Sequence, residues 1–495
     1  MNSFQRKSLY AALAGAGALG AVGTAQAVGL NANGLGQVLI YPYYTVQADV
    51  SGNAYNSLLS VVNTTASAKA VKVRFLEGKN SREVLDFNLF LSRHDVWTAA
   101  VLPSSSGGGK VLTFDNSCTI PSNTFLKAGV DFVNYAYTGT ADDKGGSGLD
   151  RTKEGYVEII EMATYAPTTC TSIQVTHVGG VPFDCAGLND TQAGGSATAS
   201  SASGGLFGGM SLINVAGGTD YTEDAVALTS FNNGKNNGLY APAGSVSPQL
   251  TDASPPVSAA FGDEDGFVVK KLGGGAVPVF FSNWPNPPYN KADPVSAVLM
   301  RNQVMNEYVL DAATKSGTDW VITFPTKRFY VNAGTGPATK LFQRNFNDGV
   351  GSCDDIKLAI YDREEHTTST PVTFSPPPPV PGVAICWEAN VITFNNSNVL
   401  RSVNSANINT GNSNGWLNLT FATSTSATFH TLGNQTNTEV LFFGTSSATT
   451  VTYFGLPLVG FAVQQFVNGQ LVVGGVTTLS NYGGNFVHKT TTLIC

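Results

Sequence analysis

Alternation of apolar and polar residues between Gly36 and Pro103 constrains the fold more than any other feature of this chain. Apolar side chains take every second position in two segments, which contain Val71, Val73 and Phe75, and Leu85, Phe87, Leu89 and Leu91. Successive side chains of a strand point to opposite faces of a sheet, so each segment buries one face. Short strands separated by turn residues, without a long βαβ pattern, are typical of antiparallel sandwiches.

We therefore predict a mainly β protein with two or more antiparallel, immunoglobulin-like β-sandwich domains and one or two short helices. The first core is expected to contain Phe75, Leu85, Phe87, Leu89 and Trp97. Further strands are predicted at 156–162, 319–325, 328–331, 356–361, 383–394, 416–421 and 440–443. The pair Asn468-Gly469 between apolar runs predicts a tight hairpin turn.

One long helix is predicted near 295–313, where apolar residues recur near the helical period. Residues 192–205 are almost entirely Gly, Ala, Ser and Thr and cannot bury enough apolar area to offset their ordering entropy. The expected division is a signal peptide at 1–27, an N-terminal sandwich at 28–190, a low-complexity loop or insert at 191–260 and a C-terminal β-rich domain at 261–495.

The first 27 residues have the pattern of a secretory signal peptide. Arg6 and Lys7 precede a run of small and apolar residues that ends at Ala25-Gln26-Ala27. This order predicts export and cleavage at about Ala27/Val28. The expected location is the cell surface or the extracellular space, with the periplasm as the alternative.

Charge is scarce in this chain. Charged residues make up 12% of it, against roughly 25% in an ordinary globular protein, and the net charge is −7. A mildly negative chain argues against a nucleic-acid partner. No later apolar run approaches the roughly 20 residues of a membrane helix, so no transmembrane segment is expected in the mature chain. A neutral surface repels neighbouring molecules weakly, which favours self-association.

Six cysteines follow the signal segment: Cys118, Cys170, Cys185, Cys353, Cys386 and Cys495. In an oxidising compartment an even number predicts up to three disulfides, and sequence alone does not choose among the 15 pairings. Closeness along the chain favours Cys170–Cys185 and Cys353–Cys386, which leaves Cys118 for Cys495. Alternatively, Cys495 is unpaired or bonds another molecule.

Catalytic motifs are missing from the sequence. It contains no G-x-S-x-G elbow, no H-E-x-x-H, no Walker loop and no dinucleotide fingerprint. The five histidines (His94, His177, His366, His430 and His488) are far apart and are expected to be solvated or hydrogen-bonded. Glu158 and Glu161 share a predicted strand, but their odd separation points them to opposite faces. The charged cluster at 362–366 is expected to be a solvated strand end. We therefore assign no catalytic residue and no certain cofactor.

Two acidic loops are candidates for calcium. Asp263, Glu264 and Asp265 form one tight turn. In the other, counting from Asp143 places glycine at position six and Glu154 at position twelve, as in a calcium loop. Position three is a glycine, however, and the alternative for both loops is a solvated turn.

Four segments resemble a group of uncharacterised secreted proteins of Gram-negative bacteria. They are 75–97 (FLEGKNSREVLDFNLFLSRHDVW), 149–162 (LDRTKEGYVEIIEM), 300–331 and 453–489. The resemblance implies export and a β-rich fold and transfers no functional residue. The low-charge composition, rich in Thr, Asn and Gly, is also similar to that of surface-layer proteins, although cysteines are unusual there.

Three functions are compatible with these features. The first is an exported structural or assembly protein of the cell surface, a surface-layer or filament subunit that associates with itself. The second is a secreted adhesin that binds a cell-surface glycan or another ligand, for which the 284–289 loop (WPNPPY) offers aromatic rings. The third is a secreted hydrolase, whose acids or catalytic triad would be assembled only by folding.

Overall fold

A computed structural model of the 495-residue chain describes residues 27–195, 198–232, 238–261, 279–284, 290–332, 341–346, 351–365, 382–421, 428–433, 439–442, 445–448 and 452–494. The predicted signal segment up to residue 26, the acidic turn 263–265 and Cys495 lie outside the described residues.

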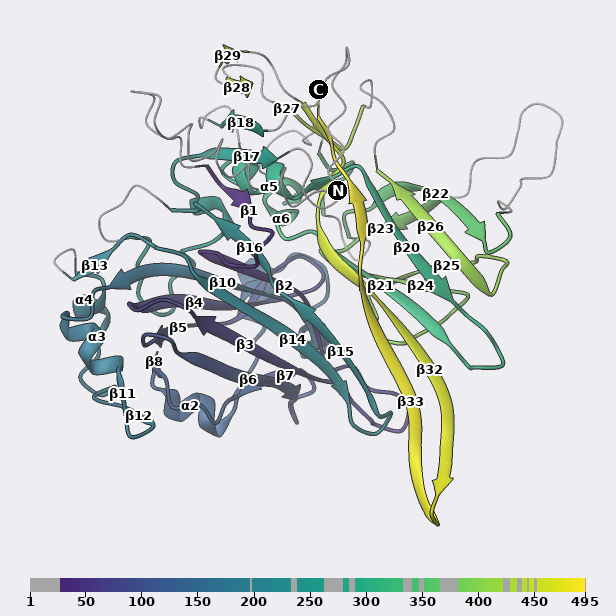
Figure 1. Cartoon of the computed structure of the whole chain (residues 1–495), viewed down its shortest axis with the longest axis horizontal. Helices are drawn as coiled ribbons and strands as arrows, with labels where there is room; N and C mark the ends of the chain where they lie inside the picture. Colours follow the sequence, from purple (N-terminus) through teal and green to yellow (C-terminus); the bar gives the residue numbers. More distant parts are fainter. Residues whose placement is uncertain are drawn as a thin grey trace, which may run out of the picture.

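Two antiparallel sheets form the N-terminal half (Figure 1). The first contains, in spatial order, β1 (Gly29–Leu30), β16 (Val226–Thr229), β2 (Val38–Thr45), β10 (Glu154–Tyr165), β4 (Ala68–Glu77), β5 (Glu83–Leu91) and β8 (Cys118–Ile120), with β13 (Ala199–Ser200) paired to β10. The second contains β15 (Thr219–Asp224), β14 (Leu206–Asn214), β3 (Asn56–Asn63), β6 (Val96–Pro103), β7 (Gly109–Leu112) and β9 (Val130–Asp131).

The core between these two sheets is the one that the alternation predicted. Phe75, Phe87 and Leu89 from the first sheet and Trp97 from the second are buried in one cluster, and Leu85 packs against it half-buried. The Phe87 and Trp97 rings meet edge to face at 5.8 Å. The mainly β, antiparallel sandwich prediction is confirmed here.

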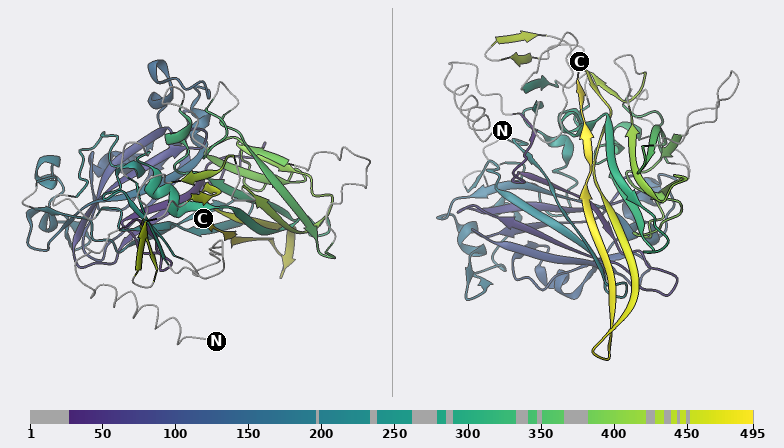
Figure 2. Two further views of the ribbon diagram at one scale, coloured as in Figure 1. Left: turned by 90° about the horizontal axis from the view of Figure 1, so that it is seen from above. Right: turned by 45° about the vertical axis from the view of Figure 1, so that its right-hand side comes forward.

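Two further sheets form the C-terminal half (Figure 2). One contains β23 (Gly382–Ile385), β22 (Asp354–Asp362), β26 (Asn414–Thr420), β20 (Gln303–Val309) and β34 (Lys489–Thr491). The other contains β25 (Ser405–Ile408), β24 (Ala389–Phe394), β21 (Gly317–Thr323), β32 (Val459–Val473) and β33 (Val476–Val487).

The β21 sheet is buried on both faces and joins the two halves. Trp320 and Ile322 lie in the core between the two C-terminal sheets, whereas Val321 and Phe461 lie in the core of the N-terminal sandwich. Alternate side chains of the same strands thus serve two cores.

Short elements cover the ends of these sheets. The small sheets are β11 (His177–Val178) with β12 (Val181–Pro182), β17 (Val257–Phe261) with β18 (Val279–Asn283), β19 (Met300–Arg301) with β31 (Leu456–Pro457), β28 (Glu439–Phe442) with β29 (Thr445–Ala448), and β27 (Thr431–Gly433), β30 (Thr452–Phe454) and β35 (Leu493–Ile494). The helices are α2 (Asn123–Ala128), α3 (Cys170–Val175), α4 (Asp190–Ala193), α5 (Asp293–Leu299), α6 (Arg328–Val331), and the 3-10 turns η1 (Tyr135–Tyr137), η2 (Gly139–Ala141), η3 (Leu149–Lys153) and η4 (Leu250–Asp252).

The prediction of one long helix over 295–313 is wrong. Helix α5 ends at Leu299, and β20 follows from Gln303. Val304 and Tyr308 are both fully buried in the second core. Residues four apart share one face in a helix and also in a strand, so this spacing does not separate the two structures. Among the described residues, no helix has the length and apolar character needed to cross a membrane.

Two other expectations differ from the structure. Residues 206–229, predicted as part of a low-complexity loop or insert, form β14, β15 and β16 of the N-terminal sheets. Residues 328–331, predicted as a strand, form helix α6, and the Tyr330 hydroxyl of this helix contacts Asp293 Oδ1 (2.6 Å) and Ser296 Oγ (2.8 Å). The predicted strands at 319–325, 356–361 and 416–421 are confirmed as β21, β22 and β26.

Candidate functional site

Strands β32 and β33 form a long two-stranded hairpin, which we call the ribbon (residues 459–487). The turn is Gly474-Gly475, both with positive φ (59° and 81°), between the paired residues Val473 and Val476. Glycine reaches this conformation without steric cost. The predicted turn at Asn468-Gly469 is wrong, because the pairing register shifts there and the two residues form a bulge within β32.

The base of the ribbon is hydrogen-bonded to the body of the molecule along both of its strands. Strand β21 pairs with β32 as far as Gln465. Two asparagine side chains of β33 bind the β14–β15 hairpin: Asn481 Nδ2 donates to the carbonyl of Gly217 in its turn at 2.7 Å, and Asn485 Nδ2 donates to the Thr222 carbonyl and the Glu223 carboxylate of the edge strand β15. No ladder of backbone hydrogen bonds joins β33 to β15 in the described residues, so the two strands meet through side chains.

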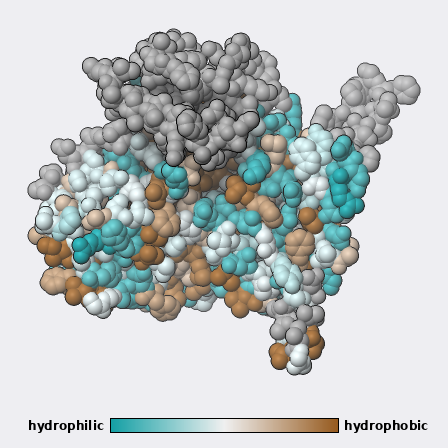
Figure 3. Space-filling model, in the orientation of Figure 1, coloured by the Kyte–Doolittle hydropathy of each residue, from teal (hydrophilic) through white to brown (hydrophobic). Residues whose placement is uncertain are grey.

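Beyond this base the ribbon projects from the body of the molecule (Figures 1 and 2). The last backbone contact on the β32 side is Val467 N–H to the Thr314 carbonyl, 3.1 Å. The free part, residues 468–480, extends about 20 Å at 3.4 Å per residue. Val472 is 65% exposed and Val476 63% exposed at its tip, and Figure 3 shows hydrophobic surface there.

The ribbon carries no charged residue, and neither does any position from Val440 to Val487. Exposed strand edges in natural proteins are commonly protected by charges, prolines or short length, because unpaired N–H and C=O groups recruit other strands. The free part of this ribbon has no charge and no proline, and its one irregularity is the bulge at Asn468-Gly469 near its base. Its backbone edges can accept a further strand.

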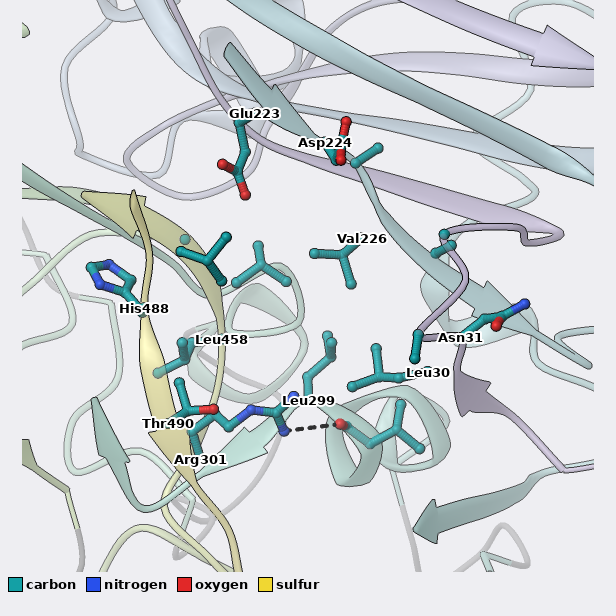
Figure 4. Close-up of a pocket in the computed structure, with 18 of the residues that line it drawn as sticks. Leu30, Asn31, Glu223, Asp224, Val226, Leu299, Arg301, Leu458, His488 and Thr490 are labelled. Atoms are coloured by element: carbon teal, nitrogen blue, oxygen red, sulfur yellow. Dashed lines mark hydrogen bonds between the residues drawn. The ribbon is translucent and has the colours of Figure 1, made fainter. Parts of the chain in front are cut away.

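A cavity of about 380 Å³ lies between the base of the ribbon and the N-terminal sheets (Figure 4). Its walls come from β1, β15, β16, α5 and both ends of the ribbon, and apolar side chains such as Leu30, Val226, Leu299 and Leu458 supply much of the lining. Glu223 and Asp224 lie on one side, and His488, Arg301 and Thr490 on others.

Burial shapes the charges of this cavity. It raises the pKa of Glu223 to about 7, although the hydrogen bond from Asn485 opposes the rise. It lowers the pKa of His488 to about 4, against the opposing contact with the Val321 carbonyl. It also lowers the pKa of Arg301 to about 10. Arg301 donates to the carbonyls of Val298 (3.2 Å) and Met300 (2.7 Å).

The wall of this cavity holds no serine or cysteine side chain among the described residues. An activated nucleophile of either type, hydrogen-bonded to His488 or Glu223, is therefore absent from the described wall. The described residues also contain no group of three or more His, Cys, Asp or Glu side chains placed to hold a metal.

The structure does not bring Asp143 and Glu154 together as calcium ligands. Asp143 accepts two hydrogen bonds from Arg151, both at 2.7 Å. Glu154 is buried elsewhere and accepts hydrogen bonds from Tyr43 and Ser402, both at 2.6 Å. The Arg151 guanidinium thus occupies the position beside Asp143 that a calcium ion would need. The other candidate, Asp263, Glu264 and Asp265, lies outside the described residues.

The remaining acidic and histidine candidates have structural partners. Glu158 pairs with Arg74 (2.7 Å) and Glu161 with Lys69 (2.6 Å), so these two carboxylates do not act together. The described part of the charged cluster, 362–365, is a largely exposed strand end, as expected. His430, which is buried, binds the Phe421 carbonyl (2.7 Å) and Asp354 (3.1 Å).

The disulfide prediction is partly confirmed. Cys353 bonds Cys386 as predicted. The prediction for Cys170–Cys185 is wrong, because Cys118 bonds Cys185 across 67 residues and Cys170 is an exposed free thiol at the start of α3. The Cys118–Cys495 pairing is therefore excluded as well. Strand β8 carries Cys118 into the same buried cluster that Cys185 packs against, and this proximity outweighs closeness along the chain.

The prediction that the 284–289 loop offers Trp284 to a glycan is wrong, because this ring is buried. Trp284 is 1% exposed, and its indole N–H donates to Ser258 Oγ at 2.9 Å. Residues 285–289 lie outside the described part. Sequence reasoning also missed the ribbon and its cavity. Gly474-Gly475 between β-branched runs and the long uncharged stretch were the available signals for the ribbon.

No protein-family model, no curated protein and no solved structure matches this chain.

Proposed function

We propose that this protein is exported and assembles with further copies of itself, as a structural component of the cell surface, through the free part of its ribbon. The observation that carries the proposal is the ribbon itself: a projecting, uncharged hairpin with open backbone edges and exposed valines at its tip. A two-stranded hairpin alone in water is marginally stable at best. Pairing with a further strand would therefore stabilise the free part of the ribbon.

We propose a second copy of this chain as the partner that pairs with the open edges of the ribbon. Open strand edges need N–H and C=O partners, which a lipid bilayer lacks, so lipid alone would leave them unpaired. An identical ribbon related by a two-fold axis offers the same groups in a self-complementary arrangement. The second ribbon is also uncharged, so the two ribbons do not repel each other. Heterologous contacts of the same edge would instead propagate into a filament.

Export rests on the predicted signal segment at 1–27. Two disulfides, Cys118–Cys185 and Cys353–Cys386, are consistent with an oxidising compartment. The cell surface is the proposed site of assembly. Immunogold labelling of intact cells distinguishes it from the periplasm.

The test compares matched pairs of lysine substitutions in the mature protein. Val472→Lys with Val476→Lys places charges on the ribbon tip. The control, Val178→Lys with Val181→Lys, changes two valines of similar exposure (62% and 53%) that pair with each other in the small β11–β12 hairpin. Light scattering after size exclusion and electron microscopy report the assembly state, with every free thiol, Cys170 included, alkylated and the samples compared with and without reductant.

We expect the unmodified protein and the control to assemble and the ribbon variant to remain monomeric, with equal melting temperatures because all four valines are exposed. A native protein that stays monomeric at every concentration overturns self-assembly. A ribbon variant that assembles like the native protein overturns the role of the ribbon.

A further inference from the structure

The outer face of the sheet formed by β22, β26 and β20 carries an organised row of side chains. Tyr361, Trp416 and Glu307 lie opposite one another on these three neighbouring strands. Their chain neighbours Ile360 and Leu417 are buried in the core below. Because side chains alternate along a strand, the row points away from the core. Trp416 is 39% exposed.

In this row the Trp416 indole stands between Tyr361 and Glu307. Tyr361 and Trp416 stack with their centroids 4.3 Å apart and their planes within 11°. This separation is close to the distance between adjacent strands, so the rings stand side by side, upright on the sheet. Tyr361 covers the indole face toward β22. The other face is turned toward β20, where Glu307 stands in the same row.

The two rows beside this stack mix apolar and polar side chains. The next row holds Ala359, Asn418 and Met305, and the one after it Lys357, Thr420 and Gln303. The amide oxygen of Asn418 is buried and has no hydrogen-bond partner among the described residues.

We infer that this face binds an uncharged oligosaccharide. A pyranose ring has an apolar face of C–H groups, which packs on the exposed part of the Trp416 indole, and a rim of hydroxyls, which donate to the Glu307 carboxylate beside it. The carboxylate beside the ring disfavours phosphate-bearing ligands by charge repulsion.

This inference does not depend on self-assembly. The row lies on β26 and its neighbours, away from the free end of the ribbon (Figure 1). The ribbon variant Val472→Lys with Val476→Lys therefore keeps the glycan face unchanged. Glycan binding by that variant separates the two proposals experimentally.

Isothermal titration of the mature protein with cellohexaose and with chitohexaose tests the inference, because the two probes share the flat β-linked ring but differ in the N-acetyl group. We expect binding of at least one of them, weakened on the order of tenfold or more by Trp416→Ala. Trp416→Phe restores part of the affinity, and Glu307→Gln weakens binding less than Trp416→Ala. The control, Phe207→Ala, removes an equally exposed ring (43%) from β14 and leaves binding unchanged.

Melting temperatures verify that each variant is folded. A native protein that binds neither probe and no member of a glycan array overturns the inference. Equal affinities of Trp416→Ala and the native protein overturn the assigned site.

Discussion

Substitution of Arg151 by methionine should be among the most damaging single changes to this protein. Arg151 is 4% exposed and donates to both oxygens of Glu77 (2.6 and 2.9 Å) and to both oxygens of Asp143 (2.7 Å each). Its guanidinium also lies 4.3 Å from the centroid of the Tyr137 ring. Methionine fills similar space but leaves the buried Glu77 carboxylate without its cation and leaves Asp143 with one cationic partner, Arg82 (3.2 Å).

Removing one partner of a buried ion pair costs about 3–5 kcal/mol, because the remaining charge is desolvated and unpaired. Arg151 serves two carboxylates, so we expect Arg151→Met to lose about 4 kcal/mol of unfolding free energy. The matched control is Arg344→Met, whose partner Asp355 is exposed. Exposed pairs contribute about 0–1 kcal/mol. Urea denaturation followed by circular dichroism measures both variants.

The pH dependence gives a second readout of the same pair. Burial alone would raise the pKa of Asp143, but the hydrogen bonds from Arg151 and Asn80 outweigh it and hold this pKa well below its usual range. A depressed carboxyl pKa stabilises the fold above the unfolded-state pKa, and this contribution is lost as the pH falls through the folded-state pKa. Below about pH 4, the native protein should therefore lose stability more steeply than Arg151→Met. If Arg151→Met costs no more than Arg344→Met, the buried network does not stabilise the fold as argued.

Three further predictions follow from the described contacts. Phe87→Ala should cost about 3–5 kcal/mol of unfolding free energy through lost burial and a cavity, and a loss under about 1 kcal/mol would contradict its place in the core. Peptide mapping without reductant should recover the Cys118–Cys185 bond, while Cys170 reacts with iodoacetamide in the native state; six free thiols would refute both disulfides. Because burial raises the pKa of Glu223 to about 7, the fold loses stability as pH rises from about 4.5 to 7, and Glu223→Gln should flatten the melting-temperature profile in that range; an unchanged profile would refute the buried carboxyl.

Local pattern was sufficient for the sandwich core. Phe75 and Phe87 belong to apolar sets that alternate with Lys72 and Arg74 or with Asp86 and Asn88, and the hydrophobic effect favours the register that turns the apolar set to the core. The same rule failed at Val304 and Tyr308, because a four-residue spacing fits both a helix and a strand. There the choice was made by the core between the two C-terminal sheets.

Disulfide pairing and the candidate sites depended on contacts between distant segments. Sequence spacing favoured Cys185 for Cys170, yet the edge of the first sheet brings Cys118 to it. The cation beside Asp143 is Arg151 rather than calcium, because η3 folds this side chain back over the acidic loop.

The sequence by itself determined the β class, the first core and the scarcity of charge, since each follows from residues within one strand or from composition. Only the tertiary structure decided that Trp284 is buried while Trp416 is exposed, and that the uncharged stretch ends in a free ribbon. Exposure and open edges depend on which strands lie next to one another, and that adjacency is set by packing across hundreds of residues rather than by local pattern.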